Sequence, residues 1–333
     1  KPRREAVDGP VVYFVDHFFR DHELIGRLPM EKGDQLHFVD SSSEPEVTRI
    51  DAFKEAVSAA DSRTPCCVVG IGGGNALDTA KAVANLLTNP GKAEDYQGWE
   101  LVKNPAVYKI GIPTLSGTGS ECSRTCVLTN IPKNLKLGMN SDYTVYDQLL
   151  LDPDLLATVP RDQYFYTGID TFMHCVESLQ GSYRNAIIDA FSIRAVQLCE
   201  EIFLSDDMMS EENREKMMIA SYIGGMAAGN VGVIHPFSAG LGVVLHVAHG
   251  LGNCLALNVL GDIYPKEYKQ FRTMIERQGV NLPTGICKDL TEEQYEGLYR
   301  GCIVHEKPLT NALGPDFKQI LTRENLIERY KSI

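Results

Sequence analysis

Residues 66–81 read CCVVGIGGGNALDTAK, and this stretch decides the fold. A short apolar run ends in three glycines, Gly72, Gly73 and Gly74, and a helical pattern follows from Ala76 to Leu87. A buried strand that turns through glycines into a helix is typical of a parallel α/β sheet. The glycines let a pyrophosphate approach the backbone, and the first N–H groups of the helix attract an anion. The pattern is not GxGxxG, so alone it predicts either a nucleotide-binding loop or only a tight turn.

Four other segments in the first half of the chain have the composition of strands, namely 11–15, 35–39, 109–112 and 148–151. Short β-branched runs between helical segments predict a parallel sheet with crossover helices. Beyond Pro153 the strand signals stop, and helical spacing appears in 208–228, 240–259 and 270–278. We therefore expect a Rossmann-like α/β domain over residues 1–152 and an all-α domain over residues 153–333.

A second polar turn supports the nucleotide interpretation. TLSGTGSE, residues 114–121, follows a later strand of the same expected sheet, and open α/β sheets bind ligands at such strand ends. Asp16 ends the first expected strand and could accept hydrogen bonds from the adenosine ribose. Its carboxylate would repel a 2′-phosphate, which favours NAD over NADP. The alternative is that Asp16 only caps the following helix.

Four side chains form a candidate metal site. Asp170 and His174 lie four residues apart in GIDTFMHCVES, so on a helix they share one face. His235 and His249 are fourteen apart, close to four helical turns, and share a face only if the segment between them stays largely helical. Three imidazoles and one carboxylate suit Zn²⁺ or Fe²⁺. Any one histidine could instead be a hydrogen-bonded core residue, but the four together predict a divalent metal.

Length, charge and cysteine usage limit the other function classes. A chain of 333 residues suggests two domains, and a formal charge of −12 argues against a nucleic-acid surface. Nine cysteines, an odd count without paired CxxC spacing, argue against a disulfide framework and indicate reduced thiols. The opening KPRREAVDGP has no apolar signal-peptide core, and residues 224–260 are too often interrupted for a membrane span. We expect a cytoplasmic protein that binds a small molecule and neither nucleic acid nor membrane.

GGGNALDTAK, PTLSGTGSE, the D-x-x-x-H of residues 170–174 and the paired histidines 235 and 249 together resemble the iron-containing (group III) alcohol dehydrogenases. The resemblance runs in order along essentially the whole chain. It implies a dehydroquinate synthase-like fold, a divalent metal (Fe²⁺ or Zn²⁺), NAD(P) and usually a homodimer. The metal ligands would be Asp170, His174, His235 and His249. The residues implied at the NAD site, with Asp16 at the ribose, are Gly72, Gly73, Gly74, Asn75, Asp78, Thr114, Leu115, Ser116 and Thr118.

The chain departs from the family pattern at three places. Asn75 stands where GGGS usually has serine, and Ala239 stands where many members carry a second histidine. Many members also begin with a strand before the first one seen here. Without the second histidine, the family pattern does not identify the residue that relays the proton. His246 lies three residues before His249 and on one helix would share its face, so it is the candidate relay, unless it is satisfied elsewhere in the helical domain.

Some segments resemble the bacterial members that oxidise 3-deoxy-D-manno-octulosonate, including LTNP (87–90), YQGWELVKNPAV (96–107) and LGMNSDYTVYDQ (137–148). That resemblance implies oxidation of the C8 hydroxyl, a primary alcohol, to an aldehyde, and a place in lipopolysaccharide biosynthesis. The metal would lower the pKa of the hydroxyl and the nicotinamide would accept the hydride. Because these members are described as oxidases, the final electron acceptor is open. Arg124 and Lys136 are the candidate partners for the substrate carboxylate.

Three alternatives remain at this point. The chain could be an NAD-dependent alcohol dehydrogenase or aldehyde reductase for another alcohol. It could be a metal- and NAD-using lyase of the dehydroquinate synthase kind, which should bring more lysine and arginine to its cleft. It could also be a binding protein that lost its chemistry, although four intact ligand-type residues weigh against that.

Overall fold

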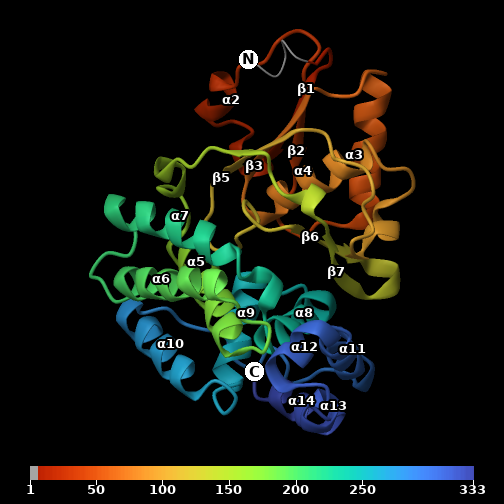
Figure 1. Ribbon diagram of the computed structural model, residues 1–333. Coiled ribbons are helices and arrows are strands. Elements are labelled where there is room, and N and C mark those ends of the chain that lie inside the picture. Colours follow the sequence, from red (N-terminus) through yellow and green to blue (C-terminus); the bar gives the residue numbers. More distant parts are fainter. Residues whose placement is uncertain (1–6) are drawn as a thin grey trace. The chain divides into compact units, whose positions relative to one another are not determined.

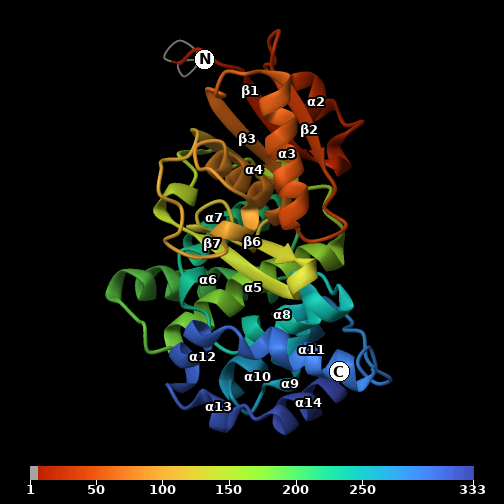
Figure 2. The same cartoon turned by 90° about the vertical axis from the view of Figure 1, so that its right-hand side faces the viewer.

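The computed structural model describes residues 7–333, and the chain divides into two compact units (Figures 1 and 2). The sheet unit contains the residues up to Leu115 together with Ser120–Leu155. The helical unit contains Ser116–Gly119 together with Leu156–Ile333. Residues 1–6, the first part of the KPRREAVDGP segment, lie outside the described residues.

The sheet unit is built on five parallel strands in the order β2-β1-β3-β5-β8. Their bounds are β1 Val11–Asp16, β2 Gln35–Val39, β3 Cys67–Gly72, β5 Lys109–Pro113 and β8 Gln148–Leu149. The order reverses beside β1, so the carboxyl ends of β1 and β3 form a switch point of the kind where open α/β sheets bind ligands. The parallel α/β architecture expected from residues 66–81 is confirmed.

Both faces of this sheet are covered, which explains why β1 and β3 are apolar along their whole length. On one face Val12, Phe14 and Val68 pack with residues of α3 (Val47–Ala60) and α4 (Gly74–Leu86). On the other face the alternate residues of β1 and β3 pack with partly buried side chains of α2 (Glu23–Arg27). Short 3-10 turns complete the unit, namely η1 His17–Phe19, η2 Ala93–Tyr96, η3 Ile131–Lys133, η4 Asp142–Thr144 and η5 Pro153–Leu156.

A second, three-stranded sheet in this unit was not predicted. β6 (Thr125–Asn130) and β7 (Leu135–Asn140) form an antiparallel pair, and the short β4 (Gly98–Trp99) adds to β7 (Figure 2). Residues of β6 alternate between buried and half-buried, as expected of a strand with one covered face. The turn between β6 and β7 places Asn134 in the left-handed region, with φ 46.

The helical unit carries no strand, since every strand of the described residues lies before residue 150. Its long helices are α5 (Arg161–Gln180), α6 (Ala186–Phe203), α7 (Glu211–Gly225), α8 (Ile234–Leu245), α9 (His249–Val259), α10 (Pro265–Gln278) and α11 (Glu292–Ile303). Shorter ones are η6 (Ala228–Asn230), α12 (Glu306–Leu313), α13 (Phe317–Ile320) and α14 (Arg323–Lys331). The all-α second domain is therefore confirmed.

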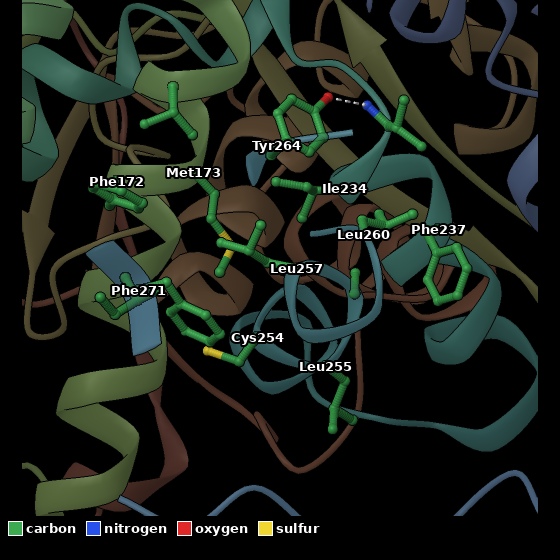
Figure 3. Packing of buried hydrophobic residues seen from close by; sticks show 14 of the residues in the cluster. Phe172, Met173, Ile234, Phe237, Cys254, Leu255, Leu257, Leu260, Tyr264 and Phe271 are labelled. Atoms are coloured by element: carbon green, nitrogen blue, oxygen red, sulfur yellow. Dashed lines mark hydrogen bonds between the residues drawn. The ribbon is translucent and has the colours of Figure 1, made fainter. Parts of the chain in front are cut away.

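Helix α5 is the centre of this unit. Nearly every residue from Tyr164 to Ser178 is buried, and the helix contacts α6, α7 and α9. A helix enclosed on all sides has no polar face. Figure 3 shows Met173 of α5 near Ile234 of α8 and Leu257 of α9, and these three belong to one buried cluster with Phe172 and with Phe271 of α10. This packing holds α5, α8 and α9 in fixed positions relative to one another.

The turn 116–119, expected with the first domain, is bound by the helical unit. Gly117 N–H donates to Ser221 Oγ at 2.8 Å, and Thr171 Oγ1 donates to the Gly117 carbonyl at 2.9 Å. A Cβ on Gly117 would lie 1.6 Å from the Thr167 carbonyl oxygen, and one on Gly119 would lie 2.3 Å from Gly225 Cα. Both glycines have positive φ, so close packing and backbone conformation each require glycine here.

All nine cysteines lie in the described part of the chain, and none of them forms a disulfide there. Eight are buried and Cys122 is partly exposed. None of the helices described here has the length and apolar character that crossing a membrane requires.

Candidate metal centre

Asp170, His174, His235 and His249 come together as predicted. Each offers a ligand atom that lies within 4.8 Å of the other three. Asp170 Oδ1 is 3.2 Å from His235 Nε2 and 3.7 Å from His174 Nε2, and Asp170 Oδ2 is 3.6 Å from His249 Nε2. Ligand atoms at about 2.1 Å around a tetrahedral Zn²⁺ lie roughly 3.4 Å apart, so these separations suit one ion.

One helix, α5, carries both Asp170 and His174, and two others, α8 and α9, carry His235 and His249. Asp170 and His174 occupy successive turns of α5, as their spacing predicted. His235 is in the first turn of α8 and His249 is the first residue of α9. The rings of His174 and His235 stack with centroids 4.5 Å apart, and those of His235 and His249 are 5.5 Å apart.

The condition for a shared helical face, a largely helical segment from His235 to His249, is not met. Helix α8 ends at Leu245, and His246 follows in the left-handed conformation with φ 55, the backbone of a helix C-terminus that turns away. The two histidines therefore meet across a helix-turn-helix. His246 is an exposed residue of that turn and shares no helical face with His249, so the reason for choosing it as proton relay is lost.

The charge pattern of the site favours a cation. Asp170 is wholly buried, which by itself raises the pKa of its carboxyl, but His174, His249 and His235 outweigh burial and hold the pKa well below its usual range. Burial lowers the pKa of His174 to about 4, so this imidazole is neutral. Burial also lowers the pKa of His235, but Glu177 and Asp170 outweigh it and raise the pKa to about 9.

A buried oxygen without a hydrogen-bond donor indicates whether the four-residue cluster suits a metal ion. Asp170 Oδ2 is buried and accepts no hydrogen bond from any residue that the structure describes. A buried carboxylate oxygen without a donor is costly, and coordination to a divalent cation would satisfy it. The donor set, one carboxylate and three imidazoles, is one that Zn²⁺ and Fe²⁺ accept. The residues present therefore fit such an ion.

Sequence reasoning missed two residues that contact these ligands. Asn253 Nδ2 donates to Asp170 Oδ1 at 2.7 Å, and Glu177 accepts a short hydrogen bond from His235 Nδ1. Asn253 lies four residues after His249 and Glu177 three after His174, so helical spacing places each one turn from a ligand. That spacing is the only signal in the sequence, and many polar residues share it.

The expected nucleotide loop lies at the switch point of the parallel sheet. A Cβ on Gly72 would lie 2.9 Å from the Asp16 Cβ, and a Cβ on Gly73 would lie 3.4 Å from that of Leu115. Thr114 N–H donates to the Gly72 carbonyl at 3.0 Å. Asp16, the three glycines, Thr114 and Leu115 are thus neighbours at the carboxyl edge. Asp16 Oδ1 also accepts from Phe18 N–H at 2.9 Å, so the capping role considered as the alternative is present.

Two other residues expected at the NAD site, Asn75 and Asp78, have contacts inside the sheet unit. Asn75 Nδ2 donates to the Ser43 carbonyl at 2.9 Å and so holds the loop after β2. Both oxygens of Asp78 are engaged, one by Ser120 Oγ at 2.5 Å and the other by Val127 N–H at 2.8 Å. Ser116, with Thr118, belongs to the turn bound by the helical unit.

The two candidate cations for a substrate carboxylate are already paired. Arg124 contacts Asp142 at 2.9 Å and Glu100 at 2.5 Å. Lys136, a buried residue of β7, contacts Glu44 at 2.9 Å. Both would have to exchange a protein carboxylate for that of a substrate.

In a comparison with known proteins, both halves of the chain match models of the same family. The family model "Iron-containing alcohol dehydrogenase" matches residues 20–153, and "Fe-containing alcohol dehydrogenase family, C-terminal" matches residues 164–297. Sulfoacetaldehyde reductase of Bilophila wadsworthia is 34% identical over 220 residues, covering 64% of this chain and 56% of that protein. The NAD-dependent methanol dehydrogenase of Bacillus methanolicus is 32% identical over 208 residues, covering 61% and 53% respectively. The chain thus spans about half the length of the curated relatives it matches.

Solved structures show the same fold. Sulfoacetaldehyde reductase from Bifidobacterium kashiwanohense, in complex with NAD⁺, has a TM-score of 0.78 and 25% identity, covering 98% of this chain and 92% of that one. An alcohol dehydrogenase from Oenococcus oeni has a TM-score of 0.82 at 21% identity, covering 99% and 94%. The expected fold, a parallel-sheet α/β domain followed by a helical domain, is thereby confirmed.

Proposed function

Because the chain belongs to the iron-containing alcohol dehydrogenase family, we propose that it is a metal- and NAD-dependent oxidoreductase that interconverts a primary alcohol and its aldehyde. The observation that carries this proposal is the cluster of one buried carboxylate and three imidazoles within 4.8 Å. When bound, the divalent cation supplies Lewis acidity that lowers the pKa of the substrate hydroxyl, and NAD supplies a hydride acceptor.

The residues of the chain prepare the site for that chemistry. Asp170 brings the negative charge, and its burial excludes water from the carboxylate. His174 stays neutral near pH 7 because burial lowers its pKa to about 4, which keeps a nitrogen lone pair available for coordination. In the sheet unit the backbone N–H groups at the start of α4, beside Gly73 and Gly74, would bind the pyrophosphate, and Asp16 would accept from the ribose.

The metal assignment follows from the ligand set and from the family. Asp170, His174, His235 and His249 would hold Fe²⁺, with Zn²⁺ as the competing ion, since both accept one carboxylate and three imidazoles. His246 remains a candidate proton relay only through its place in the turn before α9, no longer through a shared helical face. A homodimer in the cytoplasm is proposed from the resemblance alone.

As the specific substrate we propose the C8 hydroxyl of 3-deoxy-D-manno-octulosonate. Support comes from the segments at residues 87–90, 96–107 and 137–148 that resemble enzymes acting on this sugar acid. The ion pairs of Arg124 and Lys136 weigh against either side chain as an open carboxylate receptor. The relatives are named for sulfoacetaldehyde and methanol, so simple alcohols and aldehydes form the second candidate class.

One experiment tests the metal, the cofactor and the substrate together. The protein is stripped with a chelator, reloaded anaerobically with Fe²⁺ or Zn²⁺, and assayed by NADH absorbance with 3-deoxy-D-manno-octulosonate and a panel of primary alcohols. We expect NADH formation that requires metal. Turnover without any bound metal would overturn the proposal. Turnover of a phosphorylated substrate without net NADH would point instead to a lyase of the dehydroquinate synthase kind.

A further inference from the structure

We propose that Glu177 is a positioning residue that holds the proton of His235 on Nδ1 and thereby presents the Nε2 lone pair to the metal. The inference rests on the proposed function only in that it requires the four-residue cluster to bind a divalent cation. The hydrogen bonds around the Glu177 carboxylate carry it.

Glu177 is buried, with 1% of its surface exposed, and both of its oxygens are engaged. Oε2 accepts the short hydrogen bond from His235 Nδ1. Oε1 accepts from Ile234 N–H at 2.6 Å and from the Tyr264 hydroxyl at 3.2 Å. The ion pairs found among the described residues join Glu177 to no lysine or arginine, so these donors compensate its charge.

Neighbouring atoms pack closely around the Glu177 carboxylate. A Cβ on Gly232 would lie 2.6 Å from the Tyr264 hydroxyl and 3.0 Å from Glu177 Oε1. The Tyr264 hydroxyl in turn accepts from Val233 N–H at 3.0 Å, the bond drawn in Figure 3. Helix α8 has no side-chain cap of its own, and Glu177 binds the first N–H of that helix from α5. The carboxylate thus fixes the backbone that carries His235 as well as its ring.

The two nitrogens of His235 face different carboxylates, so a hydrogen bond is available to the proton of either neutral tautomer. Nδ1 faces Glu177, while Nε2 faces Asp170 Oδ1 at 3.2 Å. Coordination requires the His235 imidazole to lose one proton, and a neutral imidazole donates from one nitrogen only. A proton on Nε2 would satisfy Asp170 but would block coordination, whereas a proton on Nδ1 leaves Nε2 free to bind the metal. Glu177 favours the second state, and outer carboxylates commonly orient metal-binding histidines in this way.

The first test is Glu177→Gln, which keeps the length of the side chain. The amide oxygen can still accept from Ile234 N–H, but the amide nitrogen then faces Nδ1 as a donor and favours the tautomer that cannot bind metal. We expect Zn²⁺ affinity, measured by competition with a chromophoric chelator, to fall ten- to hundredfold. The visible spectrum of the Co²⁺-loaded variant should change as well. Tyr264→Phe is the matched control, because it removes another donor to the same carboxylate without touching His235, and its affinity should stay within threefold.

A second measurement needs no variant. In the Zn²⁺-loaded wild-type protein, ¹⁵N-histidine NMR should show His235 protonated at Nδ1 and coordinated through Nε2. Coordination through Nδ1 would overturn the inference, as would a folded Glu177→Gln protein with wild-type Zn²⁺ affinity. Wild-type protein that binds neither Zn²⁺ nor Fe²⁺ would overturn the proposed function itself, so the two failures are distinguishable.

Discussion

Asn253 donates a 2.7 Å hydrogen bond to Oδ1 of Asp170, and both side chains are wholly buried. Asn253 reaches Asp170 from α9, one turn beyond His249, so a single helix supplies both an expected metal ligand and a donor to another ligand. The bond occupies one oxygen of the carboxylate and leaves Oδ2, which has no donor among the described residues, for the cation.

Asn253→Ala should therefore destabilise the metal-free protein. Loss of a buried hydrogen bond to a charged group costs about 1.5–3 kcal/mol, which urea unfolding in the presence of chelator would measure. Asn258→Ala is the matched control, since Asn258 lies on the same helix and its amide oxygen accepts only a 3.2 Å bond from Arg272 at a partly buried site. Equal unfolding midpoints for both variants would show that the bond to Asp170 contributes nothing.

His249→Ala should abolish bound metal and turnover together, because it removes one of the four ligands. His246→Asn is the comparison, since asparagine tolerates the left-handed backbone at this position. We expect His246→Asn to retain full metal by elemental analysis, and its turnover then tests the proton-relay role directly. Full metal in His249→Ala would show that the site assignment is wrong.

Gly119→Ala should unfold the protein far more readily than Gly279→Ala, although the two glycines have φ of 63 and 61. The Cβ on Gly119 would lie 2.3 Å from Gly225 Cα, whereas nothing lies within 4 Å of one on Gly279. Gly279→Ala should cost only the backbone term, about 1–2 kcal/mol. Thermal melts of both variants give the difference, and similar melting temperatures would mean that the turn 116–119 is not packed as described.

Asp16→Asn separates the two roles of this residue. The amide oxygen can still accept from Phe18 N–H and cap η1, but the negative charge is lost. If Asp16 contacts the ribose, the ratio of kcat/KM for NADP over NAD should rise about tenfold, which corresponds to about 1.4 kcal/mol. An unchanged ratio would leave only the capping role, for which Asp16→Ala should lower stability by about 1 kcal/mol.

The thiols should differ in reactivity with pH. Burial raises the pKa of Cys175 to about 12 and that of Cys302 to about 12, so the reactive thiolates form only far above neutral pH. Iodoacetamide at pH 8 should modify Cys122, the one partly exposed cysteine, and mass spectrometry of the native protein identifies the site. Raising the pH to 9 should add no label at Cys175 or Cys302, and equally fast labelling of all three would contradict their burial.

The metal ligands could be predicted because their residue types are few and their chemistry is restrictive. Asp170 and His174 required only helical spacing, which α5 provides. The path between His235 and His249 could not be predicted in the same way. It depends on one left-handed residue, His246, and histidine carries no strong preference for that conformation.

Contacts between residues far apart in the chain also could not be predicted from the sequence. In the sequence nothing distinguishes Glu177 and Asn253 from other polar residues. Only the packing of α5, α8 and α9 brings them into contact with the metal ligands. The β6–β7 pair was overlooked because LTNIPKNLKLG mixes apolar residues with lysine and asparagine, so its alternation is weak. The strands β1 and β3 were found within one residue because they are buried on both faces and therefore continuously apolar.

The turn at residues 116–119 leaves the sheet unit and returns to it within four residues, so the backbone joins the two units at three points. A fragment that ended at Leu155 would take this turn away from its hydrogen bonds to Thr171 and Ser221. A fragment that began at Leu156 would lack it altogether. Dissection at a single peptide bond therefore damages both halves, and chimaeras with related enzymes must be grafted at three junctions.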